Sequence, residues 1–176
     1  MAVAFRSALV LTLFVLTRDR RARTNHVKWG RLLIRTARSF LVPVVVAALL
    51  AVGIAALARF TRFDKDRSFY STVLVIIASY YVLFAVLDGS AHALAWELVI
   101  AVAFSAVAII GALVVPTLVG IGIIAHGLFD LVHDVFITNS GVPSWWPSFC
   151  GSIDVLLGLW VVLLTRSRLA CRGASI

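Results

Sequence analysis

Long apolar segments constrain the fold of this chain more than any other feature. The sequence is 62% hydrophobic and only 14% charged, whereas soluble domains contain about 25% charged residues. A helix needs about 20 apolar residues to cross the hydrocarbon core of a bilayer. The sequence therefore predicts an all-α integral membrane helical bundle of five spans, at residues 40–60, 70–87, 91–115, 117–136 and 152–165.

The N-terminal part differs in composition from the rest of the chain. An apolar run over residues 1–17 is followed by basic residues, and residues 26–38 alternate basic and apolar side chains. Residues 1–17 suit an uncleaved anchor, an amphipathic interfacial helix or an extension upstream of the true start. Residues 26–38 suit a helix lying on the membrane surface, and a solvated basic linker fits them equally well. The sequence thus leaves open a sixth, N-terminal or interfacial helix. We expect an amphipathic segment at 1–39, the helical bundle at 40–168 and a C-terminal tail at 169–176.

Basic residues are confined to particular segments. All 16 Lys and Arg lie outside the interval from Ser68 to Thr165, which holds five of the eight acidic residues and three of the four His. Lys and Arg beside apolar spans interact with anionic headgroups, so the net charge of +8 indicates the lipid bilayer as partner and not nucleic acid.

The same distribution predicts an orientation. Loops that lack Lys and Arg tend to lie outside the cytoplasm. We therefore expect a multi-pass protein of the cell (inner) membrane, with its polar residues near the extracytoplasmic face. The basic residues between Arg18 and Arg38 conflict with this orientation if residues 40–60 cross the membrane once.

The predicted span 117–136 carries ionisable side chains at a regular spacing. His126, Asp130 and His133 are spaced i, i+4 and i+7, so an uninterrupted helix would place them on one stripe. Charged side chains inside a bilayer are energetically costly and by default mark a functional site. The stripe is therefore our starting point for a candidate site.

Neighbouring spans bring further polar residues to the depth of this stripe. Because consecutive spans cross in opposite directions, Glu97 in the third span and Asp154 in the fifth lie near the same membrane face. No Lys or Arg within the spans neutralises these carboxylates, so they are protonated, pair with His, stay solvated or bind a cation. Polar helix ends explain three further residues at this depth equally well: Asp88, His92 and Asp134.

Imidazole and carboxylate groups together are ligands of zinc and non-haem iron. We predict His126, Asp130 and His133 as ligands of a divalent transition metal, Zn or Fe, although the spacing is not an H-E-x-x-H signature. Asp130, Glu97 and Asp154 are the predicted catalytic groups. A metal-free version would use a protonated carboxylic acid as general acid. Both versions predict an enzyme that acts on a lipid or isoprenoid dissolved in the bilayer.

Non-enzymatic functions would use the same residues. Chains of His and Asp in membranes form proton or metal-ion paths, although this chain lacks the repeats and paired broken helices of many transporters. A non-catalytic accessory subunit of a larger membrane complex, or a homo-oligomer, would use the polar cluster for assembly. A buried hydrogen-bond network that only holds the helices together is a further alternative.

The region after residue 125 carries a recognisable order of motifs. The helix from His126 to His133 reads HGLFDLVH, and it is followed by Pro143, Cys150 and Asp154. This order resembles a family of small bacterial multi-pass membrane proteins of unknown function. Their C-terminal half contains a His-Gly-x-x-Asp-x-x-His helix, a proline-containing loop, and a Cys and an Asp that open the last helix.

The resemblance covers roughly residues 125–164 and departs from the family pattern at Asp134, where a second His is common. It implies no activity, and if that His were a ligand the metal interpretation would be weaker for this chain. The resemblance implies a shared site at four positions: His126, Asp130, His133 and Asp154.

Overall fold

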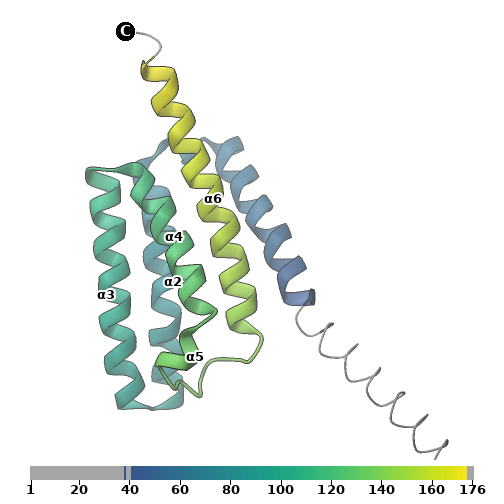
Figure 1. The fold of residues 1–176 in the computed structure, drawn as a ribbon, viewed down its shortest axis with the longest axis vertical. Coiled ribbons are helices and arrows are strands. Elements are labelled where there is room, and N and C mark those ends of the chain that lie inside the picture. Colours follow the sequence, from purple (N-terminus) through teal and green to yellow (C-terminus); the bar gives the residue numbers. More distant parts are fainter. Residues whose placement is uncertain (1–37, 39–40, 174–176) are drawn as a thin grey trace, which may run out of the picture. The chain divides into compact units, whose positions relative to one another are not determined.

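The computed structural model describes Arg38 and residues 41–173, and every regular element in this part of the chain is a helix (Figure 1). The all-α prediction is therefore confirmed. The predictions for residues 1–37 and 39–40, including a sixth helix, lie outside the described residues. In chain order the elements are a helix at Leu41–Thr61, the 3-10 helix η1 (Phe63–Lys65), α2 (Arg67–Asp88), α3 (Ala91–Leu113), α4 (Pro116–Asp130), α5 (His133–Phe136) and α6 (Trp146–Gly173).

Four of these helices are long and apolar enough to cross a membrane, namely Leu41–Thr61, α2, α3 and α6, and α4 is a shorter apolar helix. Their outward surfaces are apolar: Phe60 is 88% exposed and Leu87 is 72% exposed. Water-soluble monomers rarely expose continuous apolar surface on this scale. Lipid is the environment that such a surface requires, and the chain is a multi-pass membrane protein.

Local capping signals set the helix ends. The Asp66 side chain accepts a hydrogen bond from the Ser68 backbone N–H at the start of α2, and Gly89 ends α2 with a positive φ of 74°. Ser90 then caps α3 by accepting from the Ala93 N–H. Because so few residues join α2 to α3, the two helices run antiparallel. Pro116 begins α4 at a position where its missing N–H has no cost.

Three predicted helix boundaries are wrong. The fourth span was expected to reach residue 136, but α4 ends at Asp130, and a turn at residues 131–132 separates it from α5. The last helix begins at Trp146, six residues before the predicted start at 152, and continues to Gly173, beyond the predicted end at 165. Proline is tolerated in a first helical turn, so Pro147 does not prevent this early start. The Trp146 ring packs against Tyr80 and Phe84 of α2, which ties the first turn of α6 to the bundle.

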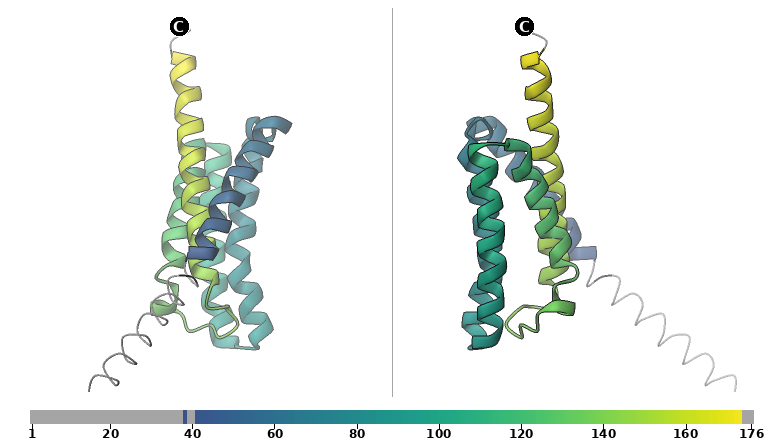
Figure 2. Two further views of the ribbon diagram at one scale, coloured as in Figure 1. Left: turned by 90° about the vertical axis from the view of Figure 1, so that its right-hand side faces the viewer. Right: turned by 60° about the vertical axis from the view of Figure 1, so that its left-hand side comes forward.

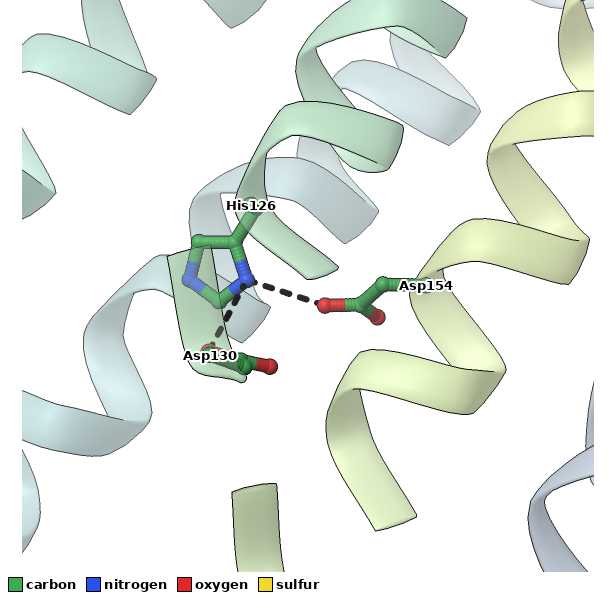
Figure 3. Close-up of side chains that lie close together, drawn as sticks. All are labelled: His126, Asp130 and Asp154. Carbon is green, nitrogen blue, oxygen red and sulfur yellow. Dashed lines mark hydrogen bonds and ion pairs between the residues drawn. The ribbon is translucent and has the colours of Figure 1, made fainter. Parts of the chain in front are cut away.

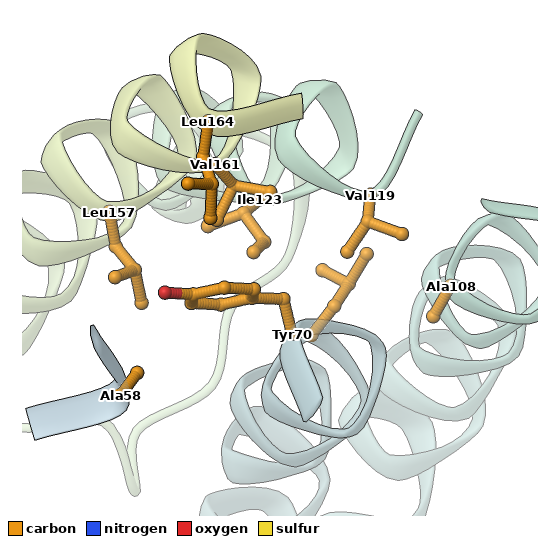
Figure 4. Close-up of a cluster of buried hydrophobic side chains, with 9 residues drawn as sticks. Ala58, Tyr70, Ala108, Val119, Ile123, Leu157, Val161 and Leu164 are labelled. Atoms are coloured by element: carbon orange, nitrogen blue, oxygen red, sulfur yellow. The ribbon is translucent and has the colours of Figure 1, made fainter. Parts of the chain in front are cut away.

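In the bundle α4 lies along α6, and α2 lies along α3 (Figure 2). The Leu41–Thr61 helix buries only small side chains at its contact face, among them Ala47, Ala51 and Ala58. Tyr70 lies among the buried side chains of the main apolar core (Figure 4). Its hydroxyl accepts a hydrogen bond from Trp160 Nε1 at 3.1 Å. The other buried members of this core are Ala58, Leu74, Ala108, Val119, Ile123, Leu157, Val161 and Leu164.

Candidate metal centre

Buried polar side chains gather at the end of the bundle where α2 and α4 finish and α3 and α6 begin. They form two groups. The first is the triad of His126, Asp130 and Asp154, each 1% exposed. The second is built around Glu97 and His133 and is described below. The sequence predicted that polar residues from several helices lie at the same depth. The structure brings them to one end of the bundle, where they form two groups instead of one.

The triad joins α4 to α6. His126 Nδ1 lies 2.9 Å from Asp154 Oδ2 and 3.6 Å from Asp130 Oδ1. His126 and Asp130 are one helical turn apart on α4, and Asp154 reaches toward them from α6 (Figure 3). One nitrogen and one oxygen from each carboxylate all lie within 4.8 Å of one another. The three side chains thus converge on one small volume between two helices.

Glycines allow α4 and α6 to approach closely enough to form the triad. A Cβ atom on Gly127 would lie 2.8 Å from both the Asp154 Cβ and the Gly151 carbonyl oxygen. A Cβ atom on Gly158 would likewise lie 2.8 Å from the Gly120 carbonyl oxygen. Such distances leave no room for a side chain, so backbone packs directly on backbone. Gly151 and Gly158, which flank Asp154 in the sequence, therefore act by letting the two helices pack closely.

The Asp130 carboxylate is the least satisfied group of the triad. It is buried, and neither oxygen makes a hydrogen bond of good geometry to a described residue, although the Tyr81 hydroxyl and the Cys150 thiol both approach it. The interval from Ser68 to Thr165 contains no Lys or Arg that could pair with it. An ionised carboxylate in such surroundings carries a large desolvation cost unless a proton or a cation compensates it. The geometry therefore calls for positive charge at this point.

The donor set fits a transition metal. Ligand atoms at 2.0–2.2 Å from a tetrahedral metal are about 3.3–3.6 Å apart. The distances from His126 Nδ1 to the two carboxylates, 2.9 and 3.6 Å, bracket this range, so small side-chain adjustments would complete a three-ligand site. With neutral imidazole the two carboxylates supply two negative charges, which one divalent cation would balance. The Cys150 Sγ, 3.9 Å from Asp154 Oδ2, is the next donor outward.

The second group lies beside the triad and belongs to different helices. His133 Nε2 is 2.8 Å from Glu97 Oε1, which also accepts a hydrogen bond from Asn139 Nδ2 at 2.8 Å. The Tyr81 ring stacks on His133 with a centroid separation of 4.1 Å, and its centroid is 6.4 Å from that of His126. Tyr81 therefore contacts the second group and also approaches the triad. The group links α2, α3, α5 and the loop that follows α5.

The turn at residues 131–132 separates His133 from the predicted stripe. An uninterrupted helix would have directed His133 alongside His126 and Asp130. The turn directs His133 instead toward Glu97 of α3 and Tyr81 of α2. A continuous α4 would lose both contacts. Tertiary contacts commonly override a local helical pattern. Among the described residues, Asp154 and not His133 accompanies His126 and Asp130 in the group that could hold a metal.

The other polar residues at this end lie on the surface. Asp88, His92 and Asp134 are exposed, as expected of polar helix ends. Asn139 is the buried participant that the sequence did not single out: it donates to both Glu97 and the Tyr81 carbonyl oxygen. In the sequence it is part of an Asn-Ser-Gly run typical of a turn, and nothing local distinguishes a buried donor from a turn residue.

The fold is that of a multi-pass membrane protein, and its apolar helices surround a buried group of imidazole and carboxylate side chains. The model of a family of unknown function, DUF6010, matches residues 40–167, and the chain belongs to this family. The match begins at the first predicted span and ends within α6, so it includes both polar groups. The expectation of membership in a family of unknown function is confirmed to this extent. Neither the curated proteins nor the solved structures contain a match to the chain.

Proposed function

We propose that the protein binds a divalent transition-metal ion inside the membrane, with His126, Asp130 and Asp154 as its ligands. The observation that carries the proposal is the buried Asp130 carboxylate, which makes no hydrogen bond of good geometry to a described residue and faces the two other donors. Zinc and iron accept one imidazole and two carboxylates as ligands. The metal would replace the missing hydrogen bonds and balance the charge.

The site is better suited to catalysis than to structure alone. Structural zinc sites are closed by four protein ligands, whereas catalytic sites keep a position open for water or substrate. A metal held by three side chains would supply Lewis-acid activation at that open position. We therefore propose a membrane enzyme, with Glu97 and His133 as a neighbouring pair that can exchange a proton.

A groove near the second group offers space for an apolar substrate chain. It has a volume of about 440 Å³ and is lined by Trp96, Ile100, Phe129, Phe136 and Ile137. Its volume falls within the usual range of small-molecule sites, roughly 300–1,000 Å³. The Phe129 ring lines this groove and lies 5.6 Å from the His133 ring, so it separates the groove from the second group. These features support a lipid or isoprenoid as substrate class.

Metal analysis of the full-length protein tests the proposal. Protein purified in detergent from cells supplied with zinc, iron and manganese should contain about one ion per chain. The substitutions Asp154→Asn and His126→Ala should lower this content at least tenfold. Asp88→Asn, an exposed carboxylate at the same end, is the matched control and should leave it unchanged. Wild-type protein free of metal, or Asp154→Asn with full occupancy, would refute metal binding.

A proton path is a second candidate, and a specific contact favours it. His133 Nδ1 lies 3.4 Å from Asp134 Oδ1, and the Asp134 side chain is 78% exposed, while Nε2 contacts the buried Glu97. The imidazole thus connects a surface carboxylate to an interior one. If protons move along it, liposomes with the protein should show proton flux that Glu97→Gln abolishes. Flux with no dependence on Glu97 would exclude this path, whatever the metal content.

A further inference from the structure

The opposite end of the bundle contains a cavity unrelated to the candidate metal centre. It has a volume of about 260 Å³ and lies between η1, the start of α2, the α3–α4 connection and the end of α6. Three cationic side chains line it: Lys65, Arg67 and Arg168. The cavity is smaller than typical sites for drug-sized ligands, which suits a headgroup better than a complete lipid.

One of the cations is fixed in position by a buried carboxylate. Arg168 donates from Nη1 to the Asp64 backbone oxygen at 2.6 Å and from Nη2 to Asp64 Oδ2 at 2.8 Å. Arg59 Nη1 also donates to Asp64 Oδ2, at 3.1 Å. Asp64 is only 3% exposed, so this arrangement is part of the core at this end. An arginine oriented in advance loses less side-chain entropy when it binds an anion.

The remaining charge at this cavity is positive. Asp64 is engaged by two arginines, and the Asp66 carboxylate accepts hydrogen bonds from Ser68 N and Oγ. Counting Arg59, which pairs with Asp64, together with Lys65, Arg67 and Arg168, and subtracting the Asp64 and Asp66 carboxylates, the local net charge is +2. Guanidinium and ammonium groups are the usual partners of phosphate oxygens. The cavity is thus complementary in charge to a phosphate-bearing anion.

The apolar surroundings distinguish a lipid from free phosphate. Val114 is 70% exposed and Leu169 is 59% exposed, and both line the cavity. The cavity lies where candidate membrane spans begin and end, so we expect it near the level of the lipid headgroups. An anionic phospholipid would bring its phosphate to the cations and its glycerol and acyl chains to the apolar side chains. Inorganic phosphate would use only the cations.

We propose that this cavity binds the phosphate of an anionic phospholipid, with Lys65, Arg67 and Arg168 as its cationic contacts. The best test removes the two cations that do not pair with Asp64, in the double variant Lys65→Gln, Arg67→Gln. Each removed cation should weaken binding about fivefold, and the pair about 25-fold. The matched control is Arg62→Gln, Arg166→Gln, which removes two exposed charges at the same end that do not line the cavity.

The measurement is lipid binding to full-length protein in neutral detergent, followed by native mass spectrometry. Phosphatidylglycerol should bind at least tenfold more tightly than phosphatidylcholine, and only the cavity variant should lose this preference. If both double variants lose the preference for phosphatidylglycerol equally, the lipid is attracted by the general positive charge of this end and not by the cavity, and the proposal is overturned. Equal affinity for the two lipids would also overturn it. Competition by millimolar inorganic phosphate that removes all phosphatidylglycerol binding would assign the cavity to free phosphate and overturn the lipid assignment.

Discussion

Two buried carboxylates at opposite ends of the bundle meet the same physical problem in different ways. Asp64, 3% exposed, contacts Arg59 at 3.1 Å and Arg168 at 2.8 Å. Asp130, 1% exposed, has the His126 imidazole at 3.6 Å as its nearest basic group, and neither oxygen makes a hydrogen bond of good geometry to a described residue. The first carboxylate is neutralised within the protein, and the second is not.

The contrast shows which carboxylate is available for chemistry. A buried carboxylate that two arginines satisfy already has its charge and its lone pairs engaged. One without such partners keeps both oxygens free for a metal or a proton, at a cost in stability. The segregation of basic residues in the sequence underlies this difference, because no Lys or Arg occurs between Ser68 and Thr165. We therefore interpret Asp64 as a structural carboxylate, which orients the arginines around it, and propose Asp130 as the carboxylate that is available to a metal or a proton.

The close contact between α4 and α6 is the first place to test the functional end. A methyl group added in Gly127→Ala would lie 2.8 Å from the Gly151 carbonyl oxygen and would push the helices apart. We expect a loss of about 1–3 kcal/mol in stability, or about 2–12 °C in Tm, together with lower metal content. Thermal unfolding in detergent and metal analysis measure both effects.

Gly53→Ala is the control for this substitution. A Cβ at Gly53 would meet nothing within 4 Å, so the change should be neutral or stabilise the helix by up to about 1 kcal/mol. If Gly127→Ala behaves like Gly53→Ala in both measurements, the triad does not depend on glycine packing.

The two carboxylates should respond differently to the same substitution. Asp64→Asn leaves Arg59 and Arg168 without their anion and should cost about 1–2 kcal/mol, since both arginines are partly exposed. In protein stripped of metal, Asp130→Asn should be neutral or stabilising, because it removes an uncompensated charge. Chemical or thermal unfolding of both variants after chelation compares them. Equal destabilisation would mean that Asp130 is as structural as Asp64.

The smallest expected effect concerns the cap of α2 beside the Asp64 end. Hydrogen bonds from Ser68 N and Oγ hold the pKa of Asp66 below its usual value of 3.8. A lowered pKa in the folded state adds stability that is present above pH 3.8 and is lost as the pH falls through the lowered value. Asp66→Asn keeps a capping oxygen but cannot titrate, so its stability should lack this acid-dependent loss. If the stability of wild type and Asp66→Asn, measured by unfolding at a series of pH values, falls equally on acidification, this role is contradicted.

Much of the fold could be predicted from the sequence, because a helix that crosses the bilayer needs a continuous apolar segment of about 20 residues. Apolar length predicts the spans, and because consecutive spans alternate in direction, it also predicts that Glu97, Asp130 and Asp154 lie at one end. The absence of basic residues in that interval pointed to unneutralised carboxylates. These inferences depend on local pattern and on charge, which the sequence carries directly.

The division of the polar residues into two groups could not be predicted. His133 fits the helical stripe by spacing, and only its contacts with Glu97 and Tyr81 reveal why the chain turns at residues 131–132. Asn139 joins the same group across 42 residues of sequence from Glu97. Such long-range hydrogen bonds leave no periodic signal. The proposed ligand set therefore changes from His133 to Asp154, although the identity of any bound metal stays a prediction.

X-ray absorption spectroscopy at the edge of the metal that copurifies with the full-length protein tests the central claim most directly. We predict a first coordination shell with one imidazole nitrogen and carboxylate oxygens at about 2.0–2.2 Å, without sulfur at about 2.3 Å. The Asp154→Asn variant should lose this signal, while His133→Gln should keep it. Two imidazoles in the shell, a signal that requires His133 and not Asp154, or no bound metal at all would contradict the account.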